Sequence, residues 1–275
     1  MTQTAPSLAL PDERAVMVAG DWHCDGTAAR MSIERAADCG VHTVLHVGDL
    51  GVGPWPREMK AFTALLDRYL AKAGSVLLVA PGNHENYDTI DAAPRDQDGL
   101  VVLGERVRAL PRGHRWQQAG RRFAALGGAV SVDQERRIPG RSWWPQEKPT
   151  RRDLDALGDA PLDVLITHEV PAGVPVTSTM TGIPQRVLED AQEVRALLAE
   201  AVDRTRPALV FSGHWHQHVV HAVPRRDGGE TTVHVLDCEH AAWNCVVLDL
   251  DTLAVRSLAK AWHTRIVHDE TWEAR

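Results

Sequence analysis

Five short apolar runs in this chain each end in a cluster of polar residues. The runs are rich in β-branched residues and lie between glycine, proline or polar positions, a pattern typical of strands buried in an open sheet. They cover residues 15–19, 43–47, 75–79, 164–167 and 208–212. In such sheets, functional side chains collect beyond the carboxyl ends of the strands. We therefore expect the five polar clusters to converge on one site.

The clusters combine carboxylate, amide and imidazole side chains. In chain order they read Asp21-Trp22-His23, Gly48-Asp49, Gly82-Asn83-His84-Glu85, His168 and Gly213-His214-Trp215-His216. Each cluster alone has an ordinary explanation, because Asp, Asn and Gly favour turns and single histidines are common at surfaces. Their joint occurrence, each after an expected strand, indicates a metal site instead.

The order and spelling of the clusters resemble those of the calcineurin-like metallophosphoesterase superfamily, in particular its bacterial members. The family pattern is Asp-x-His, Gly-Asp, Gly-Asn-His-(Asp/Glu), a lone His and Gly-His-x-His, and all five blocks occur here between Val16 and His216. The resemblance implies two metal sites that share Asp49 as a bridge. It assigns one ion to Asp21, His23, Asp49 and His216, and the other to Asp49, Asn83, His168 and His214.

Phosphoester hydrolysis by two divalent ions requires the same kinds of ligand, whether or not the resemblance holds. Two divalent ions roughly 3.5–4 Å apart can share a bridging hydroxide that acts as nucleophile, and can clamp the phosphoryl oxygens in an in-line displacement. A mixed set of imidazole, carboxylate and amide ligands suits manganese, iron or zinc better than calcium, which prefers oxygen ligands alone. We expect two divalent ions, manganese first, with iron and zinc as alternatives.

His84, next to the ligand Asn83, is expected to stay off the metals. It would protonate the leaving oxygen or stabilise developing charge, and a purely supporting hydrogen bond is the alternative role. A carboxylate could orient its ring. Four candidates lie near expected strand ends: Asp25, Glu85, Asp88 and Glu169. The sequence does not choose among them.

The segments between the clusters predict the remaining architecture. Residues 27–38, 56–72 and 187–202 carry apolar side chains at helical spacing. Six shorter alternating segments are expected to form a second sheet: 114–118, 121–126, 219–223, 231–236, 245–250 and 253–257. Together with the resemblance, they predict an α/β metallophosphoesterase fold, a four-layer α/β/β/α sandwich with two mixed β-sheets. We expect one domain over residues 1–275, with its core at about 15–258.

Composition and charge narrow the class of protein. The 275 residues are 44% hydrophobic and carry a net charge of −7, which weighs against a protein built to coat nucleic acid, although a local basic groove is compatible with it. The four cysteines form no C-x-x-C pair, as expected for reduced thiols. The chain shows no leader-like start and no run of about 18 uncharged apolar residues. We therefore expect a cytoplasmic protein without a membrane span.

A polar segment over residues 127–147 contains two adjacent tryptophans, Trp143 and Trp144, close to Arg137 and Arg141. Indoles can stack on a ring, and guanidinium groups can grip phosphate in a bidentate manner. These four side chains could therefore form a substrate wall. The alternative is a loop that its tryptophans merely attach to the body of the protein.

The sequence departs from the protein Ser/Thr phosphatase branch of the superfamily. That branch has a further Asp and two Arg beside the metal motifs, where this chain has Val52, Gly53 and Pro81. Protein phosphatase activity is therefore not expected. We predict that Arg137 or Arg141 supplies the missing phosphate grip.

These observations favour a metal-dependent phosphohydrolase that cleaves a small phosphomonoester or phosphodiester, a nucleotide being one such substrate. One alternative is a nuclease or RNA-end processing enzyme, which should show a basic track. Another is a non-catalytic metal-binding scaffold of the same fold, which should show eroded ligands. The native substrate, the native metal and the oligomeric state cannot be determined from the sequence.

Overall fold

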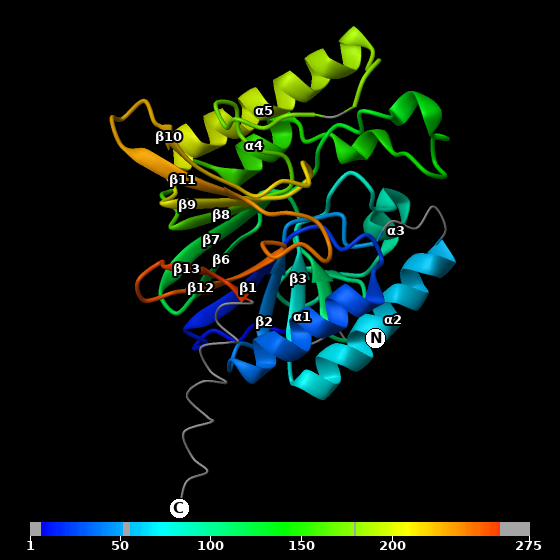
Figure 1. Cartoon of the computed structure of the whole chain (residues 1–275), viewed down its shortest axis with the longest axis vertical. Helices are drawn as coiled ribbons and strands as arrows, with labels where there is room; N and C mark the ends of the chain where they lie inside the picture. The colour runs from blue at the N-terminus through cyan, green and yellow to red at the C-terminus, as the bar shows by residue number, and fades with distance from the viewer. Residues whose placement is uncertain (1–6, 52–55, 179, 259–275) are drawn as a thin grey trace, which may run out of the picture.

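Two β-sheets pack face to face, and helices cover the outer face of each sheet (Figure 1). The computed structural model describes residues 7–51, 56–178 and 180–258. The layers run helix, sheet, sheet, helix, so the expected four-layer α/β/β/α sandwich with two mixed sheets is confirmed. The expected domain limits extend beyond this part, because residues 1–6 and 259–275 lie outside the described residues.

The first sheet has seven strands among the described residues, in the order β13-β12-β1-β2-β3-β5-β4. Their bounds are β1 (Ala15–Ala19), β2 (Thr43–His46), β3 (Val76–Val79), β4 (Val101–Val102), β5 (Val107–Ala109), β12 (Cys245–Asp249) and β13 (Val255–Ser257). β1, β2, β3 and β5 run parallel to one another. β12, β13 and β4 pair antiparallel with their neighbours, which makes the sheet mixed.

The second sheet has six strands in the described part of the chain, in the order β10-β11-β9-β8-β7-β6. Their bounds are β6 (Arg115–Gln118), β7 (Arg121–Leu126), β8 (Val164–Thr167), β9 (Leu209–Ser212), β10 (Val219–Pro224) and β11 (Glu230–Val235). The four central strands are parallel, and β10 and β6 are antiparallel edges. This sheet therefore carries the strands before the fourth and fifth polar clusters.

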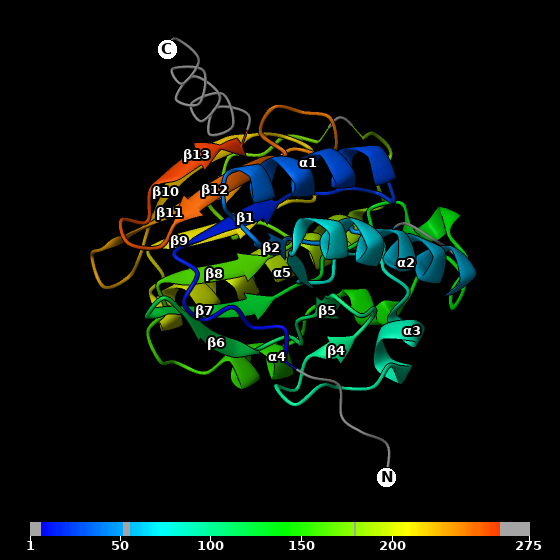
Figure 2. The same ribbon diagram turned by 90° about the horizontal axis from the view of Figure 1, so that it is seen from below.

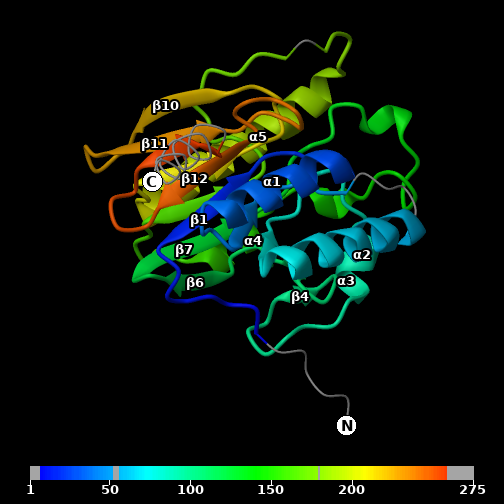
Figure 3. The ribbon, with the colours of Figure 1, turned by 60° about the horizontal axis from the view of Figure 1, so that its bottom comes forward.

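Helices α1 (Gly26–Asp38) and α2 (Pro56–Ala73) lie side by side on the outer face of the first sheet (Figures 2 and 3). On the second sheet, α4 (Arg151–Leu157) and α5 (Gln185–Thr205) take the equivalent place. The short helix α3 (Tyr87–Ala92) follows the third cluster, and two 3₁₀ turns, η1 (Gln134–Arg136) and η2 (Pro145–Glu147), lie in the polar segment. No helix in the described ranges is long and apolar enough to cross a membrane.

Apolar side chains fill three layers of core, one between each pair of neighbouring layers. In β1, Met17 and Ala19 face the helices, whereas Val16 and Val18 face the other sheet. Successive side chains of a strand point to opposite faces, so a strand covered on both faces must be apolar throughout. This double burial explains the continuous apolar runs that precede the clusters.

The expected membership of the second sheet is wrong for its last two segments. β12 pairs antiparallel with β1, with Ala19 opposite Cys245, and β13 pairs with β12. Both strands therefore belong to the first sheet. β12 buries both faces, with Val247 in the helix-side core and Val246 between the sheets. A hydrophobic pattern indicates a strand and its buried faces but does not identify the neighbouring strand.

Candidate metal centre

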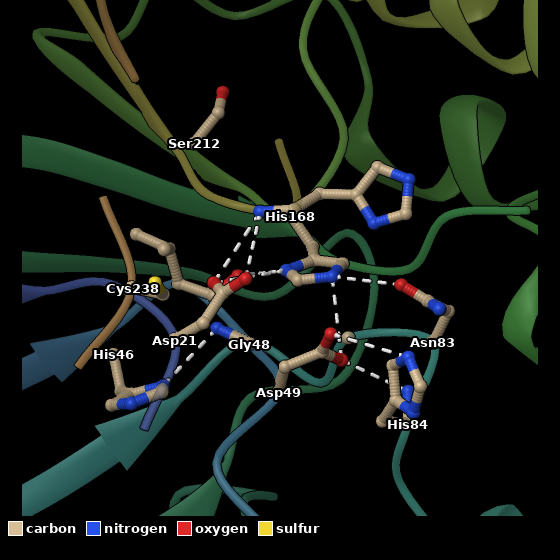
Figure 4. Close-up of polar contacts among 12 residues, drawn as sticks. Asp21, His46, Gly48, Asp49, Asn83, His84, His168, Ser212 and Cys238 are labelled. Atoms are coloured by element: carbon tan, nitrogen blue, oxygen red, sulfur yellow. Dashed lines mark hydrogen bonds and ion pairs between the residues drawn. The ribbon is translucent and has the colours of Figure 1, made fainter. Parts of the chain in front are cut away.

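The carboxyl ends of β1, β2 and β3 in one sheet meet those of β8 and β9 in the other. Figure 4 shows His168 between Asp21 on one side and Asp49 and Asn83 on the other. The sheets are joined here by the His168 ring, whose Nδ1 lies 3.0 Å from the Val47 carbonyl oxygen. All seven ligands expected from the sequence lie in this region, in two groups that meet on one carboxylate.

The first group contains Asp21, His23 and His216, whose candidate ligand atoms all lie within 4.8 Å of one another. His216 Nε2 is 3.2 Å from Asp21 Oδ2. His23 Nδ1 is 2.8 Å from Glu239 Oε2, so this ring nitrogen can donate to the carboxylate while Nε2 faces the centre. Glu239 thereby orients His23, a role that carboxylates often play beside metal-binding histidines.

The second group contains Asp49, His168 and His214, again with candidate ligand atoms within 4.8 Å of one another. Because a carbonyl oxygen only accepts, His168 Nδ1 donates to Val47 and leaves Nε2 for a ligand. That nitrogen is 2.9 Å from Asn83 Oδ1. Asn83 thus joins the second group, as the resemblance implies.

Asp49 lies between the two groups and is 1% exposed. Its Oδ1 is 3.3 Å from His168 Nε2 and accepts a hydrogen bond from the backbone N–H of His84 at 2.9 Å. Its Oδ2 is 3.7 Å from His23 Nε2. One buried carboxylate therefore faces donors of both groups, the arrangement that a bridging ligand requires.

Glycines let the cluster backbones approach one another closely. A Cβ atom on Gly82 would lie 2.2 Å from Asp49 Oδ1, and one on Gly213 would lie 2.2 Å from Asp21 Oδ1. Neither position can therefore take a side chain without displacing a candidate ligand. This close approach explains why glycine precedes the ligands in these clusters.

Several candidate ligands adopt left-handed backbone conformations that non-glycine residues avoid. The φ angles are 44° at His23, 51° at Asp49, 68° at His214 and 50° at His216. Such conformations cost about 1–3 kcal/mol each and concentrate at functional sites, where the surrounding structure maintains them. Here they turn four ligand side chains toward one point just after their strands end.

The buried charges of the centre favour a cation. Burial lowers the pKa of His168, but the charge of Asp49, its contact with the ring, and the charges of Asp21 and Glu85 together outweigh burial and raise the pKa to about 10. Burial likewise opposes protonation of His23, yet the bond to Asp49 and its charge raise that pKa to about 9. The carboxylates thus attract protons onto these two imidazoles, because the carboxylates are concentrated and desolvated. Divalent ions would supply the same positive charge, so the donor set and its electrostatics fit the two metals.

His84 lies beside the two groups without joining either. Its Nε2 is 4.0 Å from Asp49 Oδ2 and 2.7 Å from Arg137 Nη2. A guanidinium only donates, so His84 Nε2 accepts, and burial lowers the pKa of this histidine to about 4. Arg137 is held in turn by Asp133, whose Oδ2 accepts from Nε at 2.9 Å.

None of the four carboxylates considered from the sequence hydrogen-bonds His84 in the described structure. Glu85 accepts from the backbone of Leu50 and Gly82, Asp25 caps α1, and Glu169 accepts from Trp215. Asp88 lies in the first turn of α3. Asp133 acts on His84 through Arg137, and no sequence signal beyond its place four residues before that arginine identifies it.

A buried chain of hydrogen bonds holds the Asn83 amide. Asn83 Nδ2 donates to Ser131 Oγ at 3.0 Å, and Ser131 Oγ donates to Glu147 Oε2 at 2.8 Å. Glu147 also accepts from Trp143 Nε1 at 2.9 Å. These hydrogen bonds direct Asn83 Oδ1 toward the second group, because the amide nitrogen already donates to Ser131. Sequence inspection missed Ser131 and Glu147, which reach Asn83 only through tertiary packing.

Neither of the two adjacent tryptophans lines the cavity at the metal centre. Trp144 is 3% exposed, so the substrate-wall interpretation does not hold for it, because a buried indole cannot stack on a ligand. Trp143 is bound to Glu147, and neither it nor Arg141 lines the cavity at the centre, whereas Arg137 does. Val52 and Gly53 lie outside the described residues.

Replacement of Ser131 by alanine should weaken the second metal site. Loss of the hydroxyl frees the Asn83 amide to rotate, and removal of such supporting partners typically lowers metal affinity about 10–100-fold. Manganese titration of the metal-stripped protein would measure this affinity. Ser142→Ala is a matched control, because Ser142 Oγ binds the Ile138 backbone in the same segment. Equal affinities in the wild type and Ser131→Ala would contradict the assigned role.

Comparison with known proteins identifies the family. The model of calcineurin-like phosphoesterases matches residues 15–218, a range that contains all five clusters. The chain belongs to the calcineurin-like phosphoesterase family. Membership in the calcineurin-like phosphoesterases indicates a hydrolase of phosphoester bonds. A search among curated proteins found no match.

Two solved structures that resemble this chain in fold are distant from it in sequence. TT1561 of Thermus thermophilus is 14% identical, with a TM-score of 0.54 over 89% of this chain and 99% of that protein. A dimetal phosphatase from Danio rerio is 11% identical, with a TM-score of 0.53 over 86% of this chain and 93% of that protein. At these identities the likeness shows the fold alone.

Proposed function

We propose that this chain is a dinuclear metal-dependent phosphohydrolase that cleaves a small phosphomonoester or phosphodiester. The observation that carries the proposal is the position of Asp49, one buried carboxylate facing donors of both ligand groups. A shared carboxylate offsets the repulsion between two close cations, so this arrangement supports a pair of ions rather than one. The fold shared with a dimetal phosphatase agrees with it.

When bound, the two ions supply an activated water and neutralise charge on the phosphoryl oxygens. The chain itself binds and orients the ester. Arg137 is a cation that lines the cavity beside the centre, and phosphoryl oxygens accept from a guanidinium more strongly than an imidazole nitrogen does. Substrate would therefore draw Arg137 away from His84 Nε2. Once Arg137 has moved, His84 Nε2 is free to take up a proton from solvent, which the negative phosphoryl group favours, and to pass it to the leaving oxygen.

Hydrolysis of paired chromogenic esters tests this function. We expect metal-stripped protein to be inactive and manganese to restore turnover of p-nitrophenyl phosphate or bis(p-nitrophenyl) phosphate, with iron and zinc refills ranking the metals. The faster ester identifies monoesterase or diesterase activity. Turnover that survives complete metal removal would contradict the proposal. A strong preference for a single-stranded oligonucleotide over both esters would replace it with nuclease activity.

Replacement of Arg137 by alanine should lower kcat/KM on the preferred ester by about 10–100-fold, since a hydrogen bond to a charged group contributes about 1.5–3 kcal/mol. Arg141→Ala is the matched control, because Arg141 is exposed and does not line the cavity. Arg137→Lys should recover only part of the loss, because lysine lacks the bidentate fork. Unchanged kinetics in Arg137→Ala would rule out the phosphate grip.

A further inference from the structure

The cavity at the metal centre is larger than a phosphoryl group requires. Its volume is about 530 Å³. A phosphate has five heavy atoms, and at roughly 30 Å³ per water-sized unit it fills at most about 150 Å³. Sites for organic ligands have about 300–1,000 Å³. Most of the cavity is therefore open to the organic part of a substrate.

The lining of this cavity has two chemically different parts. Asp49, Asn83, His84 and Arg137 form a polar part that suits metals and phosphate. An apolar part comes from α5 and from loops next to α5 and to strands β7 and β9: Val132, Ile183, Leu188, Ala191 and Trp215. The polar residues Thr177, Ser178 and Gln217 of neighbouring loops also line the cavity. The apolar part marks a second subsite next to the phosphoryl position.

Helix α5 divides its apolar residues between core and cavity. Val187, Val194 and Leu198 are fully buried against the second sheet. Leu188 and Ala191 are only half-buried and line the cavity, and Ala191 also packs against this core. A leucine left partly exposed beside a polar centre gains by burial when an apolar ligand covers it.

The apolar wall is held in place before any ligand arrives. Trp215 Nε1 donates to Glu169 Oε1 at 2.6 Å, and the Arg195 guanidinium lies 5.4 Å from the centre of the indole. Thr177 and Gln217 link the neighbouring loop to the same segment, with Thr177 N donating to Gln217 Oε1 at 3.3 Å. A wall fixed by such bonds costs little ordering free energy on binding.

We propose that this subsite binds the organic group of a phosphoester, and that the group is apolar and at least as large as one aromatic ring. The inference rests on the proposed function, because it takes the phosphoryl group of that ester to bind at the metal centre. Aryl and branched alkyl groups fit the wall, whereas a methyl group leaves it uncovered. A nucleoside of similar size would place polar sugar hydroxyls against it.

Binding of phosphonates to manganese-loaded protein tests the subsite without requiring turnover. Calorimetric titrations would compare methylphosphonate, phenylphosphonate and 1-naphthylphosphonate, with thymidine 5′-phosphate as a polar group of comparable size. We expect naphthylphosphonate to bind at least about tenfold more tightly than methylphosphonate, with phenylphosphonate between them. Equal affinities across the series would overturn the proposal. Thymidine 5′-phosphate binding as tightly as naphthylphosphonate would also overturn it.

Two variants test whether a preference for the naphthyl group arises from this apolar wall. Leu188→Asn makes it polar and Ala191→Leu fills it, so each should remove at least about tenfold of the naphthyl affinity and spare methylphosphonate. Val220→Asn is the control, since Val220 lies on β10, is 51% exposed and does not line the cavity. Unchanged naphthyl affinity in both variants would overturn the assignment. Affinity that rises from methyl- to naphthylphosphonate, in a protein that hydrolyses no ester, would instead contradict the proposed function alone.

Discussion

Replacement of Asp49 by asparagine should lower kcat/KM on the preferred chromogenic ester on the order of a thousandfold, because metal ions contribute several kcal/mol of transition-state stabilisation. Asp49 is the carboxylate that faces His23 of one group and His168 of the other. Asparagine keeps the size of this side chain but removes the negative charge that faces both ligand groups. Steady-state kinetics in saturating manganese, with metal content measured in parallel, would show the loss.

Asp159→Asn is the matched control for this prediction. Asp159 has an 80% exposed side chain, and its Oδ1 lies 3.9 Å from the Arg204 guanidinium on α5. The same chemical change there should leave kinetics and metal content unaltered. Full activity in Asp49→Asn would show that the carboxylate does not bridge two ions. Lost activity with two ions still bound would assign Asp49 to substrate chemistry rather than to metal binding.

Replacement of His84 by alanine should lower kcat by about 10²–10⁴, the usual contribution of a positioned acid or base. Metal content should stay unchanged, because His84 belongs to neither ligand group. If His84 protonates the leaving oxygen, the loss should be larger for phenyl than for p-nitrophenyl esters, since p-nitrophenolate leaves without help. An equal loss for both esters would indicate charge stabilisation instead.

His221→Ala is the control for this second prediction, because His221 lies on β10 and does not line the cavity. It should retain wild-type kcat on both esters. Loss of metal from His84→Ala would contradict the assigned role, since His84 would then support a ligand rather than the reaction. Wild-type kcat in His84→Ala would exclude any direct role in the chemistry.

The strands and the polar clusters could be predicted from the sequence because their signals are local. β1 and β8 have the bounds expected from their apolar runs, and each candidate ligand follows its strand within a few residues. Glycines such as Gly82 and Gly213 stand where backbone approach leaves no room for a Cβ atom. Position after a strand was therefore enough to predict that the clusters would meet.

Sheet membership and the supporting contacts could not be predicted because they depend on long-range packing. β12 is an apolar run like β1, and only the folded chain shows that it borders that strand. Ser131 contacts Asn83 from 48 positions away, and Arg137 reaches His84 from 53 positions away. The burial of Trp144 was equally hidden, since a tryptophan beside arginines is compatible with either a binding surface or an anchored loop.

The stoichiometric titration of metal-stripped protein with manganese, followed by ester turnover, tests the central claim most directly. We predict that two ions bind and that turnover rises only as the second ion enters, because the groups around Asp21 and His168 must both be filled around Asp49. Full turnover at one equivalent would contradict the dinuclear centre. Two bound ions without turnover of any tested ester would contradict the phosphohydrolase.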